Sequence, residues 1–386
     1  MKKKIAILGS TGSIGKTLIN IIKKDQKNFE IILLSADGNY KELLKQANYF
    51  KVKNLIVMNH KSYLKIKKKK ISRNIKIYND FDNLKEIFKK KTHYTMSSIS
   101  GIEGLKPTIE MIKYTNQIAI ANKESIICGW DLINNELKKY KTKFIPVDSE
   151  HFSIWYALMG INKKIIDKIY LTASGGPFLR YPKKKFKKIK IKQAIKHPNW
   201  KMGKKISIDS ATMMNKIFEI IEAKKIFDIP YAKLSIIIHP KSYVHAVLRF
   251  KNGLTKMIVH DTNMEIPIFN SLYNSNRQIR SKKIDLKTLN NLEFQNIDLK
   301  RFPVVKLLKK LPEKNSLFET ALVSVNDKLV KLFLNNRIKF TDISKKMNSI
   351  LNLKEFKKFK KLKAKKIEDI INLNKKIEIK MNNIIN

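Results

Sequence analysis

Cysteine is almost absent from this chain of 386 residues, in which Cys128 is the single example. One cysteine cannot form a disulfide within the chain, so the disulfide-stabilised class of secreted domains is excluded. A reducing cytoplasm is therefore the expected compartment.

Long apolar runs are also lacking, because no stretch approaches the roughly 18 residues that a membrane-spanning helix needs. The start, Met1 to Lys4, carries the positive charge of a signal peptide, but the apolar stretch Ile5 to Leu8 ends at once in Gly9. We therefore expect a strand there rather than a targeting segment.

Acidic residues are scarce: 32 Asp and Glu stand against 81 Lys and Arg, which gives a formal net charge of +49. A surface this basic attracts anions, so a nucleic-acid-binding protein has to be weighed. The lysines, however, are spread along nearly the whole chain, and the densest tracts lack interleaved aromatic ladders or a recognisable binding motif. We interpret the charge as a bias toward Lys, Asn and Ile that leaves the apolar and polar pattern of the fold intact.

What the chain does contain is a regular alternation of β-rich and helical stretches over its first 150 residues. This alternation predicts an α/β fold with a Rossmann-like parallel sheet covered by helices. Strands are expected at 5–8, 29–34, 54–58, 118–120 and 144–147, and helices at 14–24 and 40–50. Further strands at 168–172, 234–238, 244–250 and 255–260 indicate a second, mixed α/β domain, and the chain after Pro303 is expected to be mainly helical.

A turn with a glycine at every third place, GSTGSIG, follows the first predicted strand at Gly9, Gly12 and Gly15. Glycine lets the backbone adopt positive φ and approach a pyrophosphate, while the next helix offers free N–H groups and the positive end of its dipole. An ordinary glycine-rich loop is the alternative, since this spacing is not the commonest one. The strand before the turn and the helix after it favour a dinucleotide site.

The second strand is expected to end near Asp37, where such folds place the group that meets the adenosine ribose. A carboxylate there accepts hydrogen bonds from a free ribose hydroxyl and repels a 2′-phosphate, which favours NADH. Lys41 and the positive field of the chain could offset this charge. The residues alone leave the choice between NADH and NADPH open.

Two carboxylates, Asp148 and Glu150, stand at the end of the strand expected at 144–147. Side chains two apart in an extended segment share a face, so the pair can converge on one cation. The alternative is a capping segment, in which Asp148 or Ser149 caps a helix that begins near Phe152. Both interpretations fit the residues.

A third carboxylate, Glu219, lies on a predicted helix that follows a strand or loop at 206–208. Asn215 and Glu219 are four residues apart on one helical face, beside Lys216, which places an amide, a carboxylate and an ammonium together. This set suits a phosphorylated sugar and a metal, although an exposed helix face explains the spacing equally well.

Six blocks of this sequence, in the same order, resemble the 1-deoxy-D-xylulose 5-phosphate reductoisomerase family. They are GSTGSIG at 9–15, ANKES at 121–125, PVDSEH at 146–151, LTASGGPF at 171–178, HPNWKMGKKISIDSATMMNK at 197–216 and IHPKSYVHA at 238–246, with weaker similarity through 321–334. The resemblance implies an NAD(P)-binding domain at 1–148, a catalytic domain at 149–275 with a metal site and a mobile lid at about 174–204, a linker at 276–300 and a C-terminal helical domain at 301–386.

The resemblance also implies a reaction and its residues. The family rearranges 1-deoxy-D-xylulose 5-phosphate and reduces it with NADPH to 2-C-methyl-D-erythritol 4-phosphate, in the non-mevalonate isoprenoid pathway, with Mg²⁺, Mn²⁺ or Co²⁺ on the substrate oxygens. The implied metal ligands are Asp148, Glu150 and Glu219, with Lys123 as a further catalytic residue. Substrate contacts are implied for Lys123, Ser149, Glu150, Ser174, His197, Trp200, Ser210, Asn215, Lys216 and Glu219. Cofactor contacts are implied for Gly9, Thr11, Gly12, Ser13, Ile14, Gly38, Asn39, Asn122, Glu124 and Gly203.

The same resemblance assigns the lid its function, because the residues that match His197, Trp200 and Met202 close over the substrate and exclude water. His239 and His245 are interpreted as structural histidines. The family also suggests a homodimer. No membrane partner is expected, because no apolar run is long enough, and no specific nucleic acid is expected either. Retro-aldol cleavage with re-addition and an α-ketol shift both remain open, since both need the same metal and lid.

One departure from the family concerns the cofactor. The family usually has a basic residue for the 2′-phosphate where this chain has Ala36-Asp37-Gly38-Asn39, so the preference for NADPH is weakened. Two rival functions remain. Another NAD(P)-dependent dehydrogenase would not need three carboxylates together, and a basic nucleic-acid-binding protein derived from an inactive dehydrogenase would bind polynucleotides without turnover.

Overall fold

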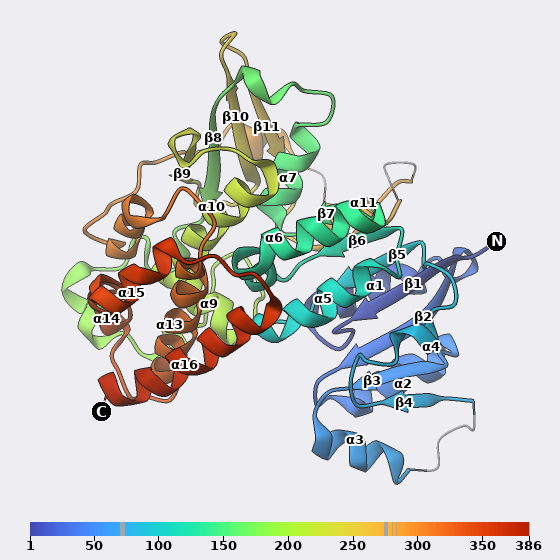
Figure 1. Cartoon of the computed structure of the whole chain (residues 1–386). Coiled ribbons are helices and arrows are strands. Elements are labelled where there is room, and N and C mark those ends of the chain that lie inside the picture. The colour runs from blue at the N-terminus through green and yellow to red at the C-terminus, as the bar shows by residue number, and fades with distance from the viewer. Residues whose placement is uncertain (70–73, 274–276, 280, 283, 386) are drawn as a thin grey trace. The chain divides into compact units, whose positions relative to one another are not determined.

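The computed structural model describes residues 1–69, 74–273, 277–279, 281–282 and 284–385 (Figure 1). The chain divides into two compact units. Unit 1 comprises residues 1–125, 131–152 and 264–280, and unit 2 comprises residues 126–130, 153–263 and 281–386.

Unit 1 is built on a seven-stranded parallel sheet with the strand order β4-β3-β2-β1-β5-β6-β7. The strands are β1 (Lys3–Leu8), β2 (Phe29–Ala36), β3 (Asn54–Val57), β4 (Lys76–Tyr78), β5 (Tyr94–Ser97), β6 (Gln117–Ile120) and β7 (Lys143–Pro146). Strand order reverses between β1 and β5, so the loop after β1 lies at a topological switch point, where such sheets bind ligands. The expected parallel sheet is confirmed.

Two of these strands, β4 and β5, were not expected from the sequence. β4 is only three residues long, and β5 has the sequence YTMS, whose polar residues weaken the apolar signal of a buried strand. β5 is nevertheless fully buried. It pairs with β1 on one side and β6 on the other, so the sheet supplies partners for its backbone groups.

Helices connect the strands of unit 1. They are α1 (Ser13–Lys23), α2 (Tyr40–Phe50), α3 (His60–Lys67), α4 (Leu84–Ile87), α5 (Leu105–Ile112), α6 (Lys123–Tyr140) and the start of α7 (Ser149–Ala157). α1 turns Leu18, Ile19 and Ile22 into the core, where each is at most 2% exposed. The helices predicted at 14–24 and 40–50 are therefore confirmed to within one residue.

α11 (Glu265–Tyr273) belongs to unit 1 although it follows the whole central part of the chain. The hydroxyl groups of Tyr94 and Ser271 are 2.8 Å apart, and the rings of Phe29 and Tyr273 meet edge to face at 5.5 Å. These contacts join α11 to β5 and β2, whereas the sequence placed residues up to 275 with the catalytic domain.

The sheet of unit 2 is mixed and four-stranded, with the order β11-β10-β8-β9. The strands β8 (Ile166–Ala173), β9 (Leu234–Ile238), β10 (Val244–Phe250) and β11 (Thr255–Val259) match all four strands expected there. Only β8 and β9 run parallel. One face packs Ile169, Leu171 and Leu248 against α10 (Met214–Phe227), so the helix with Glu219 lies directly on the sheet.

One expectation for unit 2 is wrong: residues 206–208 form neither strand nor loop but belong to helix α9 (Lys204–Thr212). The alternation of Ile206 and Ile208 with polar residues suggested a strand. In the helix, Ser207 and Thr212 donate their hydroxyl protons to carbonyl oxygens four residues earlier, so their polar groups are satisfied there. Tertiary packing thus overrides the local pattern.

Outside its sheet, α9 and α10, unit 2 contains further helices, and after Pro303 the chain is mainly helical, as expected from the sequence. These elements are α8 (Ile191–Ala194), α12 (Leu286–Leu289), η7 (Pro303–Lys310), α13 (Leu317–Leu334), α14 (Phe340–Asn352), α15 (Lys354–Lys358) and α16 (Ile367–Ile385). Ser316 and Glu319 form a capping box at the start of α13, which fixes that end of the helix. No helix in the described part of the chain combines the length and apolarity needed to cross a membrane.

Candidate active site

The glycine turn after β1 is a close backbone crossing in which only glycine fits. Gly9 has a φ of +82°, and a Cβ atom there would lie 2.8 Å from the carbonyl oxygen of Ser98. A Cβ atom on Gly15 would lie 2.4 Å from the carbonyl oxygen of Gly9. α1 therefore begins directly against the turn. The first turn of α1 has no acidic residue, and its N-cap residue, Gly12, has no side chain that could bond to the free N–H groups. These N–H groups are therefore left for an anionic ligand.

Around this turn, Thr11, Ser13 and Ile14 are exposed or half-buried. Their surfaces are open to a ligand in the position that the dinucleotide hypothesis requires. At the end of β2, Asp37 and Gly38 are exposed too. The Asp37 side chain is therefore open to solvent at the point where such folds place the adenosine ribose.

Asn39 and Asn122, both expected to contact the cofactor, have structural uses for their side chains. Asn39 accepts a hydrogen bond from the backbone of Glu42 and caps α2. Asn122 caps α6 by accepting from the Ser125 N–H at 2.6 Å, and its amide donates to the carbonyl oxygens of Ile99 and Gly101. The side chain of Asn122 thus fixes the loop between β5 and α5.

Lys123 and Asp148 come together at one edge of the unit 1 sheet. Lys123 follows β6 and Asp148 follows β7, and these strands are parallel neighbours, so their carboxyl ends lie side by side. The ammonium of Lys123 is 2.9 Å from the Asp148 carboxylate, and the two side chains are 8% and 17% exposed. A pair this buried is screened little by solvent, so the attraction between the two groups is stronger than at the surface.

Asp148 and Glu150 do converge, but by a different geometry from the one expected. Glu150 lies in the first turn of α7, which begins at Ser149 rather than near Phe152. An oxygen of Asp148 and one of Glu150 are nevertheless within 4.8 Å of each other, and Ser149 donates its hydroxyl proton to Glu150 at 2.6 Å. A ring nitrogen of His151 is equally near Asp148. The carboxylate oxygens of Asp148 and Glu150 are hard ligands, the kind that Mg²⁺ prefers.

In unit 2, Glu219 is fully buried on α10, so the exposed helix face weighed for this segment is wrong. The amide of Asn215 donates to one oxygen of Glu219, and the ammonium of Lys216 lies 2.5 Å from the other. Lys216 also donates to the carbonyl oxygen of Thr172, at the end of β8, at 2.6 Å. The expected cluster of amide, carboxylate and ammonium is therefore present.

The side chains of Ser174 and His197 are 2.9 Å apart, which joins the start of the expected lid to its last third. Nδ1 of His197 accepts hydrogen bonds from the backbone N–H groups of Asn199 and Trp200, so the ring proton of the neutral imidazole is on Nε2. Burial, with a smaller effect of Lys216, lowers the pKa of His197 to about 4. His197 therefore donates to Ser174 Oγ, which leaves the serine proton for another acceptor.

Ser210 lies on α9, and its backbone packs against the turn that follows Ser174. Gly176 has a φ of +63°, and a Cβ atom there would be 3.1 Å from Ala211 Cα and from the carbonyl oxygen of Ser210. A larger residue at 176 would push α9 away. Glycine here lets the two serine-bearing segments approach each other.

The first half of the expected lid at 174–204 is anchored within unit 2. Arg301 donates to the carbonyl oxygens of Phe178 and Tyr181 at 2.7 and 2.6 Å, and Phe178 packs edge to face on Phe340 of α14 at 4.9 Å. These contacts hold Phe178 and Tyr181 against residues from the C-terminal part of unit 2.

Trp200 is half-buried in the loop between α8 and α9, as its surroundings in the sequence suggested. Its indole ring meets His245 edge-on at 6.1 Å, and the imidazole rings of His245 and His260 stack at 3.6 Å. Burial, with His260 as a smaller cause, lowers the pKa of His245 well below its usual value. His239 and His245 both have backbone partners, which agrees with the structural role inferred for them.

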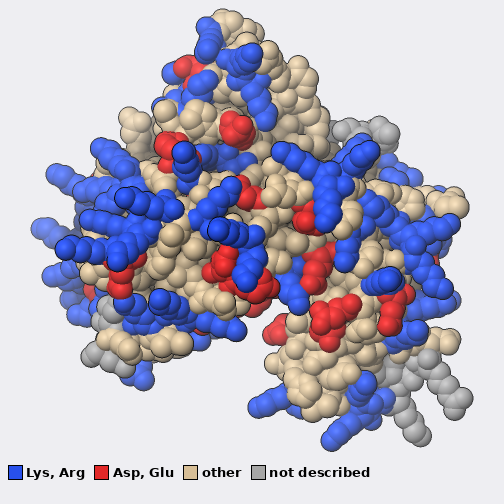
Figure 2. Space-filling view, in the orientation of Figure 1, with Lys and Arg blue, Asp and Glu red and all other residues tan. Residues whose placement is uncertain are grey.

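Basic side chains do not form a single tract on the surface that Figure 2 presents. Lys and Arg are spread across this face, with Asp and Glu side chains between them. This distribution agrees with the interpretation of the charge as a compositional bias. A polynucleotide-binding surface would instead gather its cations in one stripe or patch.

Comparisons with known proteins identify the family of this chain. Residues 5–129 match the family model described as 1-deoxy-D-xylulose 5-phosphate reductoisomerase, and residues 144–227 and 260–379 match two models of the reductoisomerase C-terminal domain. The chain is 59% identical over 385 residues to the 1-deoxy-D-xylulose 5-phosphate reductoisomerase of Pelagibacter ubique, covering 99% of each protein.

Solved structures give the same result. The reductoisomerase of Zymomonas mobilis in complex with NADPH superposes with a TM-score of 0.88 at 28% identity, covering 100% of this chain and 99% of that one. A reductoisomerase in complex with NADPH, fosmidomycin and magnesium superposes with a TM-score of 0.90 at 31% identity, covering 99% and 98%.

Proposed function

Because this chain belongs to the 1-deoxy-D-xylulose 5-phosphate reductoisomerase family, we propose that it converts 1-deoxy-D-xylulose 5-phosphate to 2-C-methyl-D-erythritol 4-phosphate with NADPH and a divalent metal. The identity of 59% along 99% of the chain carries this conclusion. The rival functions, a dehydrogenase of another kind and a nucleic-acid-binding protein, receive no support from the comparisons.

NADPH binds at the glycine turn after β1 in this proposal. The pyrophosphate meets the backbone between Gly9 and Ile14, where the start of α1 supplies N–H groups and the positive end of a helix dipole. The related structures that contain NADPH support this cofactor. Further cofactor contacts are proposed for Gly38, Asn39, Asn122, Glu124 and Gly203, with the backbone as the contact at Asn122, since its amide is already engaged.

The divalent metal has Asp148 and Glu150 of unit 1 and Glu219 of unit 2 as its proposed ligands. Carboxylate oxygens suit a hard cation, and a related structure contains magnesium. When bound, the metal polarises the substrate carbonyl as a Lewis acid. Magnesium is the proposed physiological ion, with Mn²⁺ and Co²⁺ as the alternatives that the same donor set accepts.

The remaining polar residues orient the substrate. Ser174 is free to donate its proton outward, since His197 occupies one of its acceptor positions, and this suits a phosphate or hydroxyl oxygen. Ser149, Ser210, Asn215 and Lys216 complete the proposed substrate contacts. The ammonium of Lys216 also neutralises part of the phosphate charge.

Lys123 is the proposed catalytic cation next to the reacting carbons. Its ammonium is already held by Asp148, so its position is fixed before the substrate binds. Trp200, with His197, forms the cover that excludes water while the aldehyde is reduced. Retro-aldol cleavage with re-addition and an α-ketol shift use the same residues, and the proposal does not choose between them.

A homodimer is proposed on the basis of the unit 2 sheet. Val247 lies directly across from Tyr170 on one side and Met257 on the other, so the three side chains share one face of the sheet. Met257 is 46% exposed and Leu254, in the adjacent hairpin turn, is 66% exposed. Covering these apolar side chains with the same face of a second copy would bury them. Light scattering of the protein and of Met257→Glu tests this proposal.

The expected compartment is the cytoplasm, because Cys128 is a buried free thiol and a reducing environment keeps it so. The function itself is tested by following NADPH and NADH oxidation with 1-deoxy-D-xylulose 5-phosphate, with and without Mg²⁺ or Mn²⁺. Absence of turnover with every metal would contradict the proposed function. Metal-dependent oxidation of either cofactor supports it.

A further inference from the structure

Asp209 is a buried carboxylate that the proposed chemistry does not use. It lies on α9, is only 2% exposed, and directly precedes Ser210, a proposed substrate contact. A carboxylate at this depth is costly unless both of its oxygens have partners. The partners of its two oxygens therefore indicate the role of Asp209.

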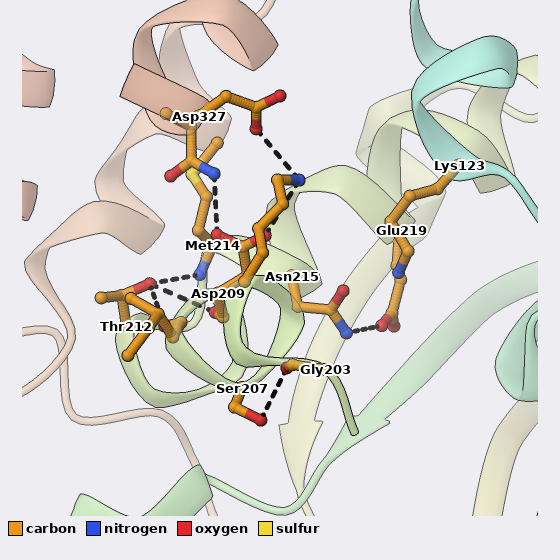
Figure 3. A network of polar contacts seen from close by, with 12 residues as sticks. Lys123, Gly203, Ser207, Asp209, Thr212, Met214, Asn215, Glu219 and Asp327 are labelled. Atoms are coloured by element: carbon orange, nitrogen blue, oxygen red, sulfur yellow. Dashed lines mark hydrogen bonds and ion pairs between the residues drawn. The ribbon is translucent and has the colours of Figure 1, made fainter. Parts of the chain in front are cut away.

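Both oxygens of Asp209 are engaged, and the partners lie in two helices (Figure 3). One oxygen accepts a hydrogen bond from the amide of Asn326 at 2.7 Å, and the other is 3.3 Å from the ammonium of Lys205, one turn earlier on α9. The same ammonium is 3.0 Å from Asp327. Two carboxylates and one amide thus tie the start of α9 to the middle of α13.

α13 provides a firm support for this connection. Asn326 is completely buried, and the capping box of Ser316 and Glu319 fixes the start of the helix. Two residues before Asn326, Ser324 donates to Asn374 of α16 at 2.6 Å. α13 is therefore held by its own contacts, and α9 is the element that the Asp209 network places.

A second neighbour of α9 is the turn after Ser174. A Cβ atom at residue 176 would lie 3.1 Å from Ala211 Cα and from the carbonyl oxygen of Ser210, so the backbones of the turn and of α9 approach closely there. α9 therefore contacts α13 through the Asp209 network and the turn after Ser174 through the backbone of Ser210. These two contacts together set the position of Ser210 relative to Ser174.

Lys205 extends the same arrangement to the next helix. Its ammonium lies 5.6 Å from the ring centroid of Phe218 on α10, the helix that carries Asn215 and Glu219. One lysine thus contacts α9, α10 and α13. Movement of α9 would therefore be passed to the residues of α10 that the substrate needs.

We infer that Asp209 is a positioning residue, which acts through its contacts with Asn326 and Lys205. It holds Ser210 and the start of α10 at the distance from Ser174 that binding of the sugar phosphate requires. The inference rests on the proposed function, because it takes Ser210 to be a substrate contact. It assigns to the C-terminal helix α13 a direct effect on substrate affinity.

The test compares Asn326→Ala with the matched control Ser324→Ala, which removes a buried hydrogen bond of α13 that does not reach α9. Asn326→Ala is expected to raise the KM for 1-deoxy-D-xylulose 5-phosphate about tenfold, since small displacements of substrate-positioning groups are costly. The KM for NADPH, and the affinity for NADPH measured by fluorescence titration without substrate, should stay within about twofold of the wild type. Ser324→Ala should leave all three values near those of the wild type, whatever it does to the melting temperature.

A second variant separates positioning from folding. The exchange Asp209→Asn with Asn326→Asp keeps one carboxylate and one amide in contact, and it should recover most of the substrate affinity that Asn326→Ala loses. Suppose that the wild type is active but Asn326→Ala has the same KM for the sugar phosphate, or changes it only as much as Ser324→Ala does. That result would overturn the inference and leave the proposed function standing. A wild type without turnover overturns the proposed function and the inference together.

Discussion

The ammonium of Lys123 lies 2.9 Å from the carboxylate of Asp148, and the two side chains come from the ends of neighbouring parallel strands. One of these residues is the proposed catalytic cation and the other a proposed metal ligand. Their contact means that the position of the lysine and the charge of the metal site are linked. Removing either partner should therefore change both catalysis and metal binding.

The first prediction concerns Lys123→Met. Its kcat should fall about 100-fold, because a positioned proton donor or cation next to the reacting group is lost. Its affinity for Mn²⁺ should rise, since the variant no longer places a competing positive charge beside Asp148. Calorimetric titration with Mn²⁺ measures the second effect. Lys106→Met, at an exposed lysine paired with Asp82, is the control, and weaker Mn²⁺ binding in Lys123→Met would show that the lysine supports the metal site.

The second prediction concerns the three proposed metal ligands. Asp148→Asn, Glu150→Gln and Glu219→Gln should each lower kcat/KM about 100-fold or more, because Lewis-acid catalysis contributes several kcal/mol. NADPH binding should be retained, as the glycine turn is untouched. The matched control is Asp167→Asn, at a half-exposed carboxylate that pairs with Arg249. Near-normal turnover in any of the three would remove that residue from the metal site.

The third prediction concerns pH. Burial lowers the pKa of His197 from its usual 6.5 to about 4, so the unfolded chain binds more protons than the folded one between these values. The stabilising contribution of neutral His197 is thus present above pH 6.5 and is lost as the pH falls toward 4. Calorimetry should show that the melting temperature of the wild type drops relative to that of His197→Gln between pH 7 and pH 5. If the difference in melting temperature between the wild type and His197→Gln stays constant with pH, His197 does not titrate in this window. The control is His60→Gln, on α3.

The fourth prediction concerns the choice of cofactor. Asp37 is exposed at the end of β2, so its negative charge should oppose a 2′-phosphate. Asp37→Lys is expected to increase the ratio of kcat/KM for NADPH to that for NADH about tenfold, which corresponds to one favourable charge contact in place of an unfavourable one. Glu30→Gln, at the opposite end of the same strand, should leave the ratio unchanged. An unchanged ratio in Asp37→Lys would show that the carboxylate points away from the ribose.

Much of the fold was predictable because the buried strands of unit 1 are apolar runs between turn signals. β1, β2 and β3 follow directly from this pattern, since strands covered on both faces have no polar side. β5 was missed for the opposite reason: its YTMS sequence is polar, although the strand is fully buried. Its serine and threonine hydroxyls find partners only in the folded chain, as Ser97 does with Thr108 at 2.6 Å.

In the candidate site, too, some features were predictable from the sequence and others were not. Asp148 and Glu150 were correctly paired, yet by the wrong geometry, because the sequence suggested an extended segment and the chain forms the first turn of α7 there. Residues 206–208 had strand-like alternation but form α9, where Asp209 is stabilised by partners outside the local sequence. No local pattern distinguishes such a buried carboxylate from an exposed one.

By itself, the sequence determined the glycine turn, the closeness of Asp148 and Glu150 and the class of fold, because each depends on residues that are near one another in the chain. Only the tertiary structure decided how Asp209 is stabilised, since its partner Asn326 lies 117 residues away. It likewise decided that the ring proton of His197 is on Nε2, because that depends on which backbone N–H groups reach Nδ1. Burial and hydrogen bonding between distant elements set these properties, and neither is encoded in the spacing of residues along the chain.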